Sequence, residues 1–206
     1  MRNGAGAVAG LAWETAESPV GELHIACSAV GLARVTFSSP AKAPARAVAD
    51  GGADAAPSAR AVAAEARRQL AAYFAGRLRE FSLPVDWSWA SGTQQRVLTA
   101  LMAAAGYGQT VTYGDLARLA GLSAASAAGP VPPGRPFLPA RVVGQVMGSN
   151  ECPVIIPCHR VVAGSGLGGY SGGTGTEVKR WLLIFEGALP PTLDWDPAGA
   201  GLPQAG

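Results

Sequence analysis

Hydrophobic and polar residues alternate along the N-terminal part of the chain. Residues 23–27 alternate, residues 29–31 carry a turn glycine, and residues 32–37 run back with the same period. Because successive side chains of a strand point to opposite faces, this pattern predicts an antiparallel strand meander over residues 11–37. The following segment, residues 38–57, is rich in Ala, Pro, Gly and Asp, which predicts a flexible connector.

Four later segments carry apolar residues at helical spacing. The first spans residues 58–76, with Ser58 expected as its N-cap and Gly76 as its end. The second spans residues 93–105, and the last spans residues 177–185. A short helix over residues 113–120 is expected to begin with a capping box of Thr112 and Asp115. The expected buried stripe of the first helix is Val62, Ala66, Leu70, Tyr73 and Phe74.

Residues 140–148 predict a further short helix with two different faces. At 100° per residue, Val142, Val143, Val146 and Met147 share one face. The opposite face carries Arg141, Gly144, Gln145 and Gly148. Each glycine costs about 1 kcal/mol against alanine, which suggests that another backbone approaches closely. That backbone is either a neighbouring helix or DNA, in which case this is the second helix of a helix-turn-helix.

Residues 154–162 place a thiol, an imidazole and a guanidinium between two β-branched runs. The runs predict buried strands, and Pro157 marks the break between them. A free thiol has a pKa of about 8.5, and lowering it by about two units would raise the thiolate fraction roughly twenty-fold. His159 is a candidate acceptor of the Cys158 proton, and Arg160 a candidate source of positive potential. The alternative is a small apolar cysteine beside a satisfied core histidine.

Composition excludes only a few classes of protein. The 206 residues are 49% hydrophobic and 15% charged, and the net charge of +2 is too mild to indicate nucleic acid by itself. However, residues 96–160 contain five arginines and only two acidic residues. Three cysteines make no disulfide framework, and no apolar run is long enough for a membrane span, which predicts a cytoplasmic protein. A zinc site would need distant Cys and His pairs to meet, so no metal is expected.

Several short motifs occur in order along the C-terminal half. They are TVTYGDLA at 110–117, RVVG at 141–144, Asn150, IPCHRV at 156–161, GYSGG at 169–173, KRWLL at 179–183 and EG at 186–187. This ordered set resembles the O6-alkylguanine-DNA alkyltransferases, also called methylated-DNA–protein-cysteine methyltransferases. The resemblance covers most of residues 17–187 and is strongest over residues 92–187.

The resemblance implies an α+β fold with two domains. A small N-terminal α/β domain with an antiparallel sheet would occupy residues 1–90, including the connector at 38–57. A mainly helical DNA-binding domain, with a helix-turn-helix and the active-site cysteine, would occupy residues 91–189. Residues 121–139, with five prolines and three glycines, are an insertion where the family has a short turn. Arg135 within it is a second candidate for the role given to Arg141. Residues 190–206 are expected to be a disordered tail.

The resemblance also implies catalytic roles. Cys158 would accept the alkyl group, His159 would act as the base through a water, and Glu186 would orient that imidazole. Asn150 would brace the active-site turn, and Tyr113 would contact the flipped base and help to rotate its phosphate. Tyr113 is also a candidate proton donor to the leaving guanine. Arg141 would fill the space that the base vacates. The DNA- and base-binding set is Arg141, Tyr113, Gly144, Gln145, Gly148, Val161, Tyr170, Ser171 and Arg160.

The function implied is DNA repair by direct damage reversal. The alkyl group of O6-alkylguanine, with O4-alkylthymine as a second candidate lesion, would pass irreversibly to Cys158 in a single turnover without a cofactor. The partner would be double-stranded DNA carrying alkylated bases, with no membrane and no obligate protein partner. The protein would be a monomer, associated with the nucleoid when bound to DNA. The alternatives are a non-catalytic lesion-binding protein of the same fold and a cysteine hydrolase.

Overall fold

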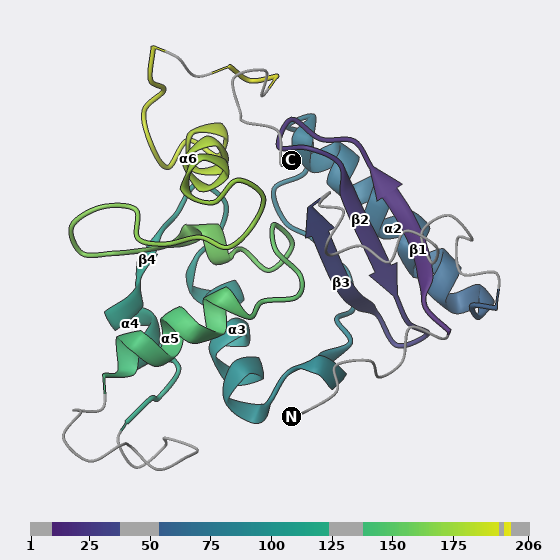
Figure 1. Ribbon diagram of the computed structural model, residues 1–206, viewed down its shortest axis with the longest axis horizontal. Coiled ribbons are helices and arrows are strands. Elements are labelled where there is room, and N and C mark those ends of the chain that lie inside the picture. Colours follow the sequence, from purple (N-terminus) through teal and green to yellow (C-terminus); the bar gives the residue numbers. More distant parts are fainter. Residues whose placement is uncertain (1–9, 38–53, 124–137, 194–195, 199–206) are drawn as a thin grey trace. The chain divides into compact units, whose positions relative to one another are not determined.

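The computed structural model describes residues 10–37, 54–123, 138–193 and 196–198 (Figure 1). These residues form two compact units, one ending at Trp89 and one beginning at Ala90. Most of the expected connector, most of the expected insertion with Arg135, and parts of the expected tail lie outside the described residues. Within the described ranges, no helix has both the length and the apolar character needed to cross a membrane.

The first unit contains the predicted strand meander. Strands β1 (Ala12–Ala16), β2 (Leu23–Cys27) and β3 (Leu32–Phe37) form an antiparallel sheet in the order β1-β2-β3. The register sets Ala16 opposite Leu23 and Ile25 opposite Val35, so apolar residues share one face. A 3-10 turn, η1 (Trp87–Trp89), closes this unit. The prediction for residues 11–37 is therefore confirmed.

Helix α2 (Pro57–Phe74) packs against this sheet with a row of small side chains. Ala59, Ala63 and Ala66 are fully buried beside Leu70 and Tyr73. Because alanine is short, the helix axis can approach the strands closely. The predicted stripe is only partly right, since Val62 and Phe74 are half-buried, whereas Ala59 and Ala63, which it did not include, are buried.

The two ends of α2 differ in how well the sequence predicted them. Ser58 is not the N-cap: Ala56 holds that position, and Pro57 occupies the first helical turn. Proline suits this position because its ring presets the helical φ and no hydrogen-bonding N–H is lost. Gly76 ends the helix as predicted, with φ of +70°. The Gly76 and Arg77 amides donate to the Tyr73 and Ala72 carbonyls, which is a Schellman motif.

The second unit is mainly helical. Its helices are α3 (Gly92–Ala104), α4 (Tyr113–Leu119), α5 (Pro139–Gly148) and α6 (Thr176–Phe185), and β4 (Val111–Thr112) pairs in parallel with β5 (Val161–Val162). Helices α4 and α5 pack against each other (Figure 1). Thr112 caps α4 by accepting from the Asp115 amide, as predicted.

The apolar face predicted for the helix over residues 140–148 is confirmed as its buried face. Val143, Val146 and Met147 are buried in α5, Val142 is half-buried, and Arg141 and Gln145 are exposed. At the other end of the unit, α6 ends at Phe185 as predicted, and Gly187 takes a φ of +77° just after the C-cap residue Glu186. The Trp181 indole N–H donates to the Asp196 carbonyl at 2.7 Å, within the segment expected to be a tail.

The strand predicted over residues 154–156 is wrong. Residues 153–156 form a tight turn, with Pro153 bridged to Ile156 and Val154 at a φ of +72°. Pro153 and Pro157 cannot donate to a sheet ladder, so the apolar run is buried without pairing as a strand. A 3-10 turn, η3 (Cys158–Arg160), follows directly and leads into β5.

Candidate active site

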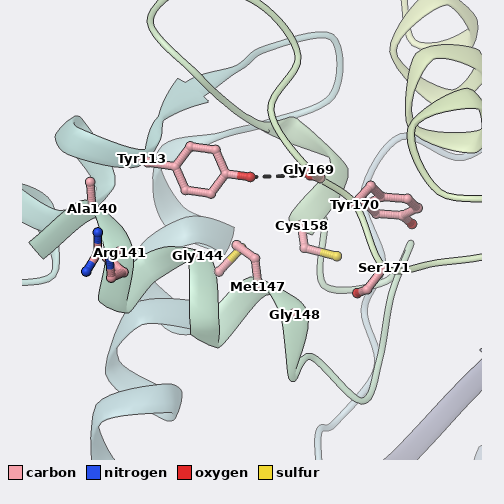
Figure 2. A pocket seen from close by; sticks show the side chains of 10 residues that line it. All are labelled: Tyr113, Ala140, Arg141, Gly144, Met147, Gly148, Cys158, Gly169, Tyr170 and Ser171. Atoms are coloured by element: carbon pink, nitrogen blue, oxygen red, sulfur yellow. Dashed lines mark hydrogen bonds between the residues drawn. The ribbon is translucent and has the colours of Figure 1, made fainter. Parts of the chain in front are cut away.

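A pocket of about 590 Å³ opens within the second unit, and Cys158 lies on its wall (Figure 2). Helix α5 supplies one side, Tyr113 at the start of α4 supplies another, η3 contributes Cys158, and the loop that follows β5 supplies the rest. The lining residues are Tyr113, Ala140, Arg141, Gly144, Met147, Gly148, Cys158, Gly169, Tyr170 and Ser171. The Cys158 side chain is therefore buried in the protein core on one side and faces a cavity on the other.

Burial raises the pKa of Cys158 above the usual value for a thiol. A hydrogen bond from Asn150, the charge of Lys179 and the backbone amides of Cys158 and His159 oppose this effect without overcoming it. The expectation that neighbours lower this pKa is therefore wrong, because loss of water outweighs them. The thiol is protonated at neutral pH, so its proton has to leave during any nucleophilic attack.

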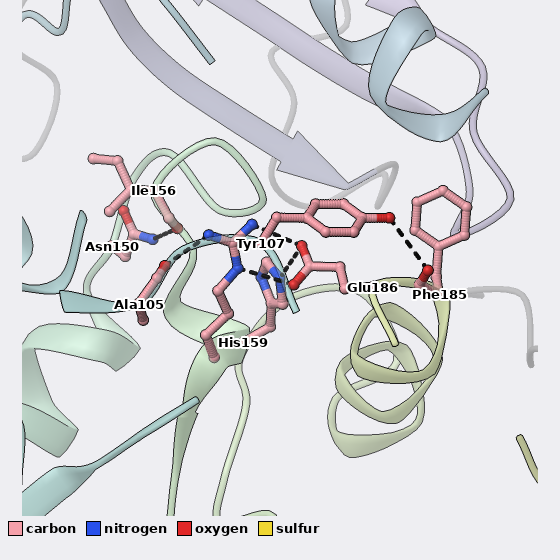
Figure 3. Close-up of polar contacts among 8 residues, drawn as sticks. Ala105, Tyr107, Asn150, Ile156, His159, Phe185 and Glu186 are labelled. Carbon is pink, nitrogen blue, oxygen red and sulfur yellow. Dashed lines mark hydrogen bonds and ion pairs between the residues drawn. The ribbon is translucent and has the colours of Figure 1, made fainter. Parts of the chain in front are cut away.

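His159, which follows Cys158 in η3, forms a buried pair with Glu186 (Figure 3). The His159 Nε2 lies 3.0 Å from Glu186 Oε1, and Nδ1 has no hydrogen-bond partner among the described residues. Burial lowers the pKa of His159, and the charges of Arg160 and Lys179 lower it further, against the opposing effect of Glu186. The imidazole is therefore neutral at neutral pH, which is the state that can accept a proton.

Arg160 lies away from the pocket. Its Nε and Nη2 donate to Glu186 Oε2 and Oε1 at 2.9 and 2.8 Å, and its Nη1 donates to the Ala105 carbonyl at 2.8 Å. It is only 6% exposed. The prediction that Arg160 contacts DNA or lends its charge to Cys158 is therefore wrong. The tight η3 turn directs the guanidinium to the carboxylate at the end of α6 instead.

Asn150 holds the turn that precedes Cys158. Its Nδ2 donates to the Ile156 carbonyl at 3.0 Å, and its Oδ1 accepts from the Cys152 amide at 3.0 Å. These two bonds span the segment in which Val154 has a positive φ. The bracing role that the resemblance implies for Asn150 stays a prediction, and these are the two hydrogen bonds through which it would act.

Some of the remaining predicted site residues line the pocket, and others do not. Tyr113, Arg141, Gly144, Gly148, Tyr170 and Ser171 line the pocket. Gln145 is exposed on the outer face of α5 and does not line it. Val161 does not line it either, because β5 pairs with β4 and its side chain is fully buried in the core. Within the described ranges, no three His, Cys, Asp or Glu side chains gather as a metal site.

Both units match one protein family. Residues 92–188 match the 6-O-methylguanine DNA methyltransferase DNA binding domain, and residues 11–87 match its ribonuclease-like domain. A crystal structure of Mycobacterium tuberculosis OGT in complex with DNA is similar, with a TM-score of 0.63 and 33% identity, over 84% of this chain and 92% of that one. The methylated-DNA–protein-cysteine methyltransferase of Methanopyrus kandleri is 40% identical over 60% of this chain and 80% of its own. The chain belongs to the methylated-DNA–protein-cysteine methyltransferase family.

Coverage of other family members is smaller. The mouse methylated-DNA–protein-cysteine methyltransferase is 43% identical over 113 residues, which is 54% of this chain and 44% of that protein. The Bacillus subtilis constitutive methyltransferase is 39% identical, over 60% of this chain and 65% of its own. The chain thus spans less than two thirds of the length of several curated methyltransferases that it matches.

Lys179 is a residue of the site that sequence reasoning missed. It is fully buried, and its Nζ donates to the Val161 and Gly169 carbonyls at 2.6 and 3.1 Å. The ammonium lies 5.9 Å from the centre of the Tyr113 ring. Burial lowers the pKa of Lys179 to about 8. The available signal was its position between Val178 and Leu182, inside the apolar stripe of α6, where a lysine needs partners.

Gly168 lets the Tyr113 ring lie against the loop of residues 163–171. Its φ is +70°, and a Cβ there would come within 2.8 Å of Tyr113 Cε2. The Tyr113 hydroxyl donates to the adjacent Gly169 carbonyl at 3.3 Å (Figure 2). We expect Gly168→Ala to displace the ring and to slow alkyl transfer by about ten- to a hundred-fold, because misplacing a site group by about 1 Å has effects of that size.

Rates of Cys158 alkylation by lesion-containing duplex DNA would measure this effect. Gly166→Ala is the matched control, because Gly166 also has a positive φ, of +122°, but has no atom within 4 Å of its would-be Cβ. Equal rates for the two variants would show that backbone strain, and not contact with Tyr113, causes any loss.

Proposed function

We propose that the protein repairs DNA by direct damage reversal. Residues 91–189 would form the alkyltransferase domain, and Cys158 would take the alkyl group of O6-alkylguanine, with O4-alkylthymine as a second candidate lesion. The observation that carries this proposal is the placement of Cys158 on a pocket wall, directly before His159 in the same turn, with the His159 ring held by the buried Glu186. The curated relatives are named methylated-DNA–protein-cysteine methyltransferases, which supports transfer to a cysteine.

The chemistry follows from the protonation states. The Cys158 sulfur would attack the carbon attached to O6, forming the S–C bond as the C–O6 bond breaks. His159 would take the thiol proton, directly or through a water, while Glu186 stabilises the imidazolium. The leaving guanine would take a proton from Tyr113, whose pKa is raised by burial and by Cys158, so that it stays protonated. The thioether has no partner in the pocket lining able to remove it, which predicts one turnover per molecule.

Helices α4 and α5 are the proposed DNA-binding element. An alkylated guanine in a duplex is out of reach of a buried sulfur, so it would be flipped out at a cost of a few kcal/mol. Arg141 is exposed on α5 at the rim of the pocket, where it could fill the vacated space. Gly144 and Gly148 on the same pocket wall would let the DNA approach the helix closely, and Gln145, Tyr170 and Ser171 would add contacts. This proposal expects a cytoplasmic monomer that associates with the nucleoid on DNA.

The direct test is a mass spectrum. The protein is incubated with a duplex oligonucleotide carrying one O6-methylguanine, and its peptides are compared with those from an unmodified duplex. We expect one methyl group on the peptide containing Cys158, one event per molecule, and restored guanine in the DNA. An unmodified peptide beside an intact lesion would overturn the proposal. Tight lesion binding in that case would favour the non-catalytic alternative, which retention of Cys158 and the buried pair otherwise disfavours.

Replacing Arg141 should separate base flipping from chemistry. In Arg141→Ala we expect transfer from duplex DNA to slow by about tenfold, or about 1.4 kcal/mol in barrier, because nothing offsets the lost stacking. Transfer from free O6-benzylguanine, which needs no flipping, should change much less. Rates on the two substrates measure the difference, with Gln145→Ala as a control on the same exposed face. Equal losses on both substrates would contradict the flipping role.

A further inference from the structure

Three buried side chains from two elements, η3 and the end of α6, form one hydrogen-bonded cluster. Figure 3 labels His159 and Glu186 of this cluster. Glu186 is the C-cap residue of α6, His159 and Arg160 come from η3, and their exposed fractions are 5%, 0% and 6%. Glu186 Oε1 faces both His159 Nε2, at 3.0 Å, and Arg160 Nη2, at 2.8 Å, whereas Oε2 accepts from Arg160 Nε at 2.9 Å. Both carboxylate oxygens are thus engaged.

The position of Glu186 is also fixed through its backbone. The Tyr107 hydroxyl donates to the Phe185 carbonyl at 3.3 Å, and a Cβ on Gly108 would lie 2.8 Å from the Glu186 carbonyl oxygen. Arg160 contacts the same segment as Tyr107 and Gly108, because its Nη1 donates to the Ala105 carbonyl at 2.8 Å. Arg160 therefore links the end of α3 to the Glu186 carboxylate at the end of α6.

This arrangement constrains the His159 tautomer. An ionised carboxylate only accepts hydrogen bonds, so His159 Nε2 must carry the proton that Glu186 receives. In a neutral imidazole the lone pair is then on Nδ1, the atom that Glu186 does not engage. The bidentate guanidinium holds the carboxylate in the plane in which this bond can form, which a lysine ammonium could not do in the same way.

We propose that Arg160 is a positioning residue for alkyl transfer, which holds Glu186 so that His159 donates through Nε2 and offers Nδ1 to the Cys158 thiol. This inference rests on the proposed function of the same site. Arg160 acts through Glu186 and touches neither DNA nor the reacting atoms. The guanidinium also supplies the counter-charge of Glu186, so the carboxylate is neutralised without a proton on His159.

The charges around His159 agree with the positioning role of Arg160. The groups that face His159 are Glu186 and Lys179 from α6 and Cys158 and Arg160 from η3, and Tyr170 faces Glu186 from the following loop. The charge of Arg160 lowers the pKa of His159. Burial raises the pKa of Glu186, but the hydrogen bonds that Glu186 accepts from His159 and Arg160 outweigh burial and lower this pKa to about 2. Without Arg160, the unbalanced carboxylate would favour a proton on His159, and a protonated His159 cannot serve as a base.

The test compares Arg160→Gln and Arg160→Lys across pH. With free O6-benzylguanine as the probe, we expect Arg160→Gln to slow transfer by about tenfold or more at neutral pH, with most of the rate recovered at alkaline pH. Arg160→Lys keeps the charge, so it should restore part of the neutral-pH rate. The loss should be the same on lesion-containing duplex DNA, in contrast to Arg141→Ala. A pH-independent loss in Arg160→Gln would overturn the proposal, because a merely structural role predicts it.

Nitrogen-15 NMR of the histidines gives a second measurement that needs no substrate. The chain has two histidines, and His24 in the first unit is an internal control. We expect the wild-type spectrum to show the Nε2–H tautomer of His159, and Arg160→Gln to titrate it at higher pH with His24 unchanged. A wild-type Nδ1–H tautomer would overturn the proposal even if no Arg160 variant folds. Because this spectrum is independent of alkyl transfer, failure of the repair function would be recognised separately by mass spectrometry.

Discussion

Cys158→Ser is expected to abolish alkyl transfer completely and to leave DNA binding close to wild type. A serine hydroxyl is a far weaker nucleophile than a thiol at neutral pH. The replacement is slightly smaller and isosteric, so the pocket formed by α4, α5 and the loop after β5 should keep its shape. The peptide mass spectrum after exposure to O6-methylguanine duplex, together with a gel-shift titration, measures both properties.

The other two cysteines provide the matched controls. Cys27 lies in β2 of the first unit, and burial raises its pKa to about 12, which makes it unreactive. Cys152 is buried in the turn before Cys158, and its amide donates to Asn150. We expect Cys27→Ser and Cys152→Ser to retain transfer, although Cys152→Ser places a hydroxyl in the core. Appearance of the methyl group on either of these peptides would contradict the assignment of Cys158.

Local signals in the sequence predicted most of the elements. The end of α2 at Gly76 and the cap of α4 at Thr112 depend on a few neighbouring residues, and both predictions are confirmed. The inner face of α5 follows from helical spacing, and it too is confirmed. Ser58 failed as an N-cap because Pro57, one residue earlier, competes for the start of the same helix.

The active-site turn could not be predicted in this way. Apolar residues 154–156 satisfy a strand pattern, and only the flanking prolines argue against it. The turn exists because Asn150 and the core hold Val154 at a positive φ, which a β-branched residue adopts at a cost. This turn orients the side chains of Cys158, His159 and Arg160 in different directions. The sequence pattern therefore did not predict the different contacts of the three side chains either.

The electrostatics of the site also depend on distant residues. Sequence neighbours suggested that Arg160 acts on Cys158, but Glu186, from the far end of α6, takes the guanidinium. Lys179, from the same helix, supplies the charge that does act on Cys158. Burial then decides the direction of the Cys158 pKa, and the extent of burial is a property of the packed unit as a whole.

Glu186→Gln is expected to be the most damaging change outside Cys158, because it affects both stability and rate. It removes the counter-charge of Arg160 in a buried position, and an unpaired buried charge costs about 3–5 kcal/mol. It also ends the stabilisation of the imidazolium, so we expect transfer to slow by about 10²- to 10³-fold. Urea unfolding at neutral pH and single-turnover rates of Cys158 alkylation measure the two effects. Glu177→Gln, at an exposed position in the first turn of the same helix, is the matched control.

The pH dependence of stability gives the sharper form of this prediction. The pKa of Glu186 is lowered to about 2 in the folded protein, against about 4.3 in an unfolded chain. A lowered carboxyl pKa contributes stability that is fully present above the unfolded value and is lost as pH falls towards the folded value, about 3 kcal/mol in all. The urea midpoint of wild type and Glu177→Gln should therefore fall between about pH 5 and pH 2, whereas Glu186→Gln should lack this part of the decline. Parallel curves for all three proteins would mean that Glu186 is not held as an ionised partner of Arg160, and the positioning of His159 would lose its physical basis.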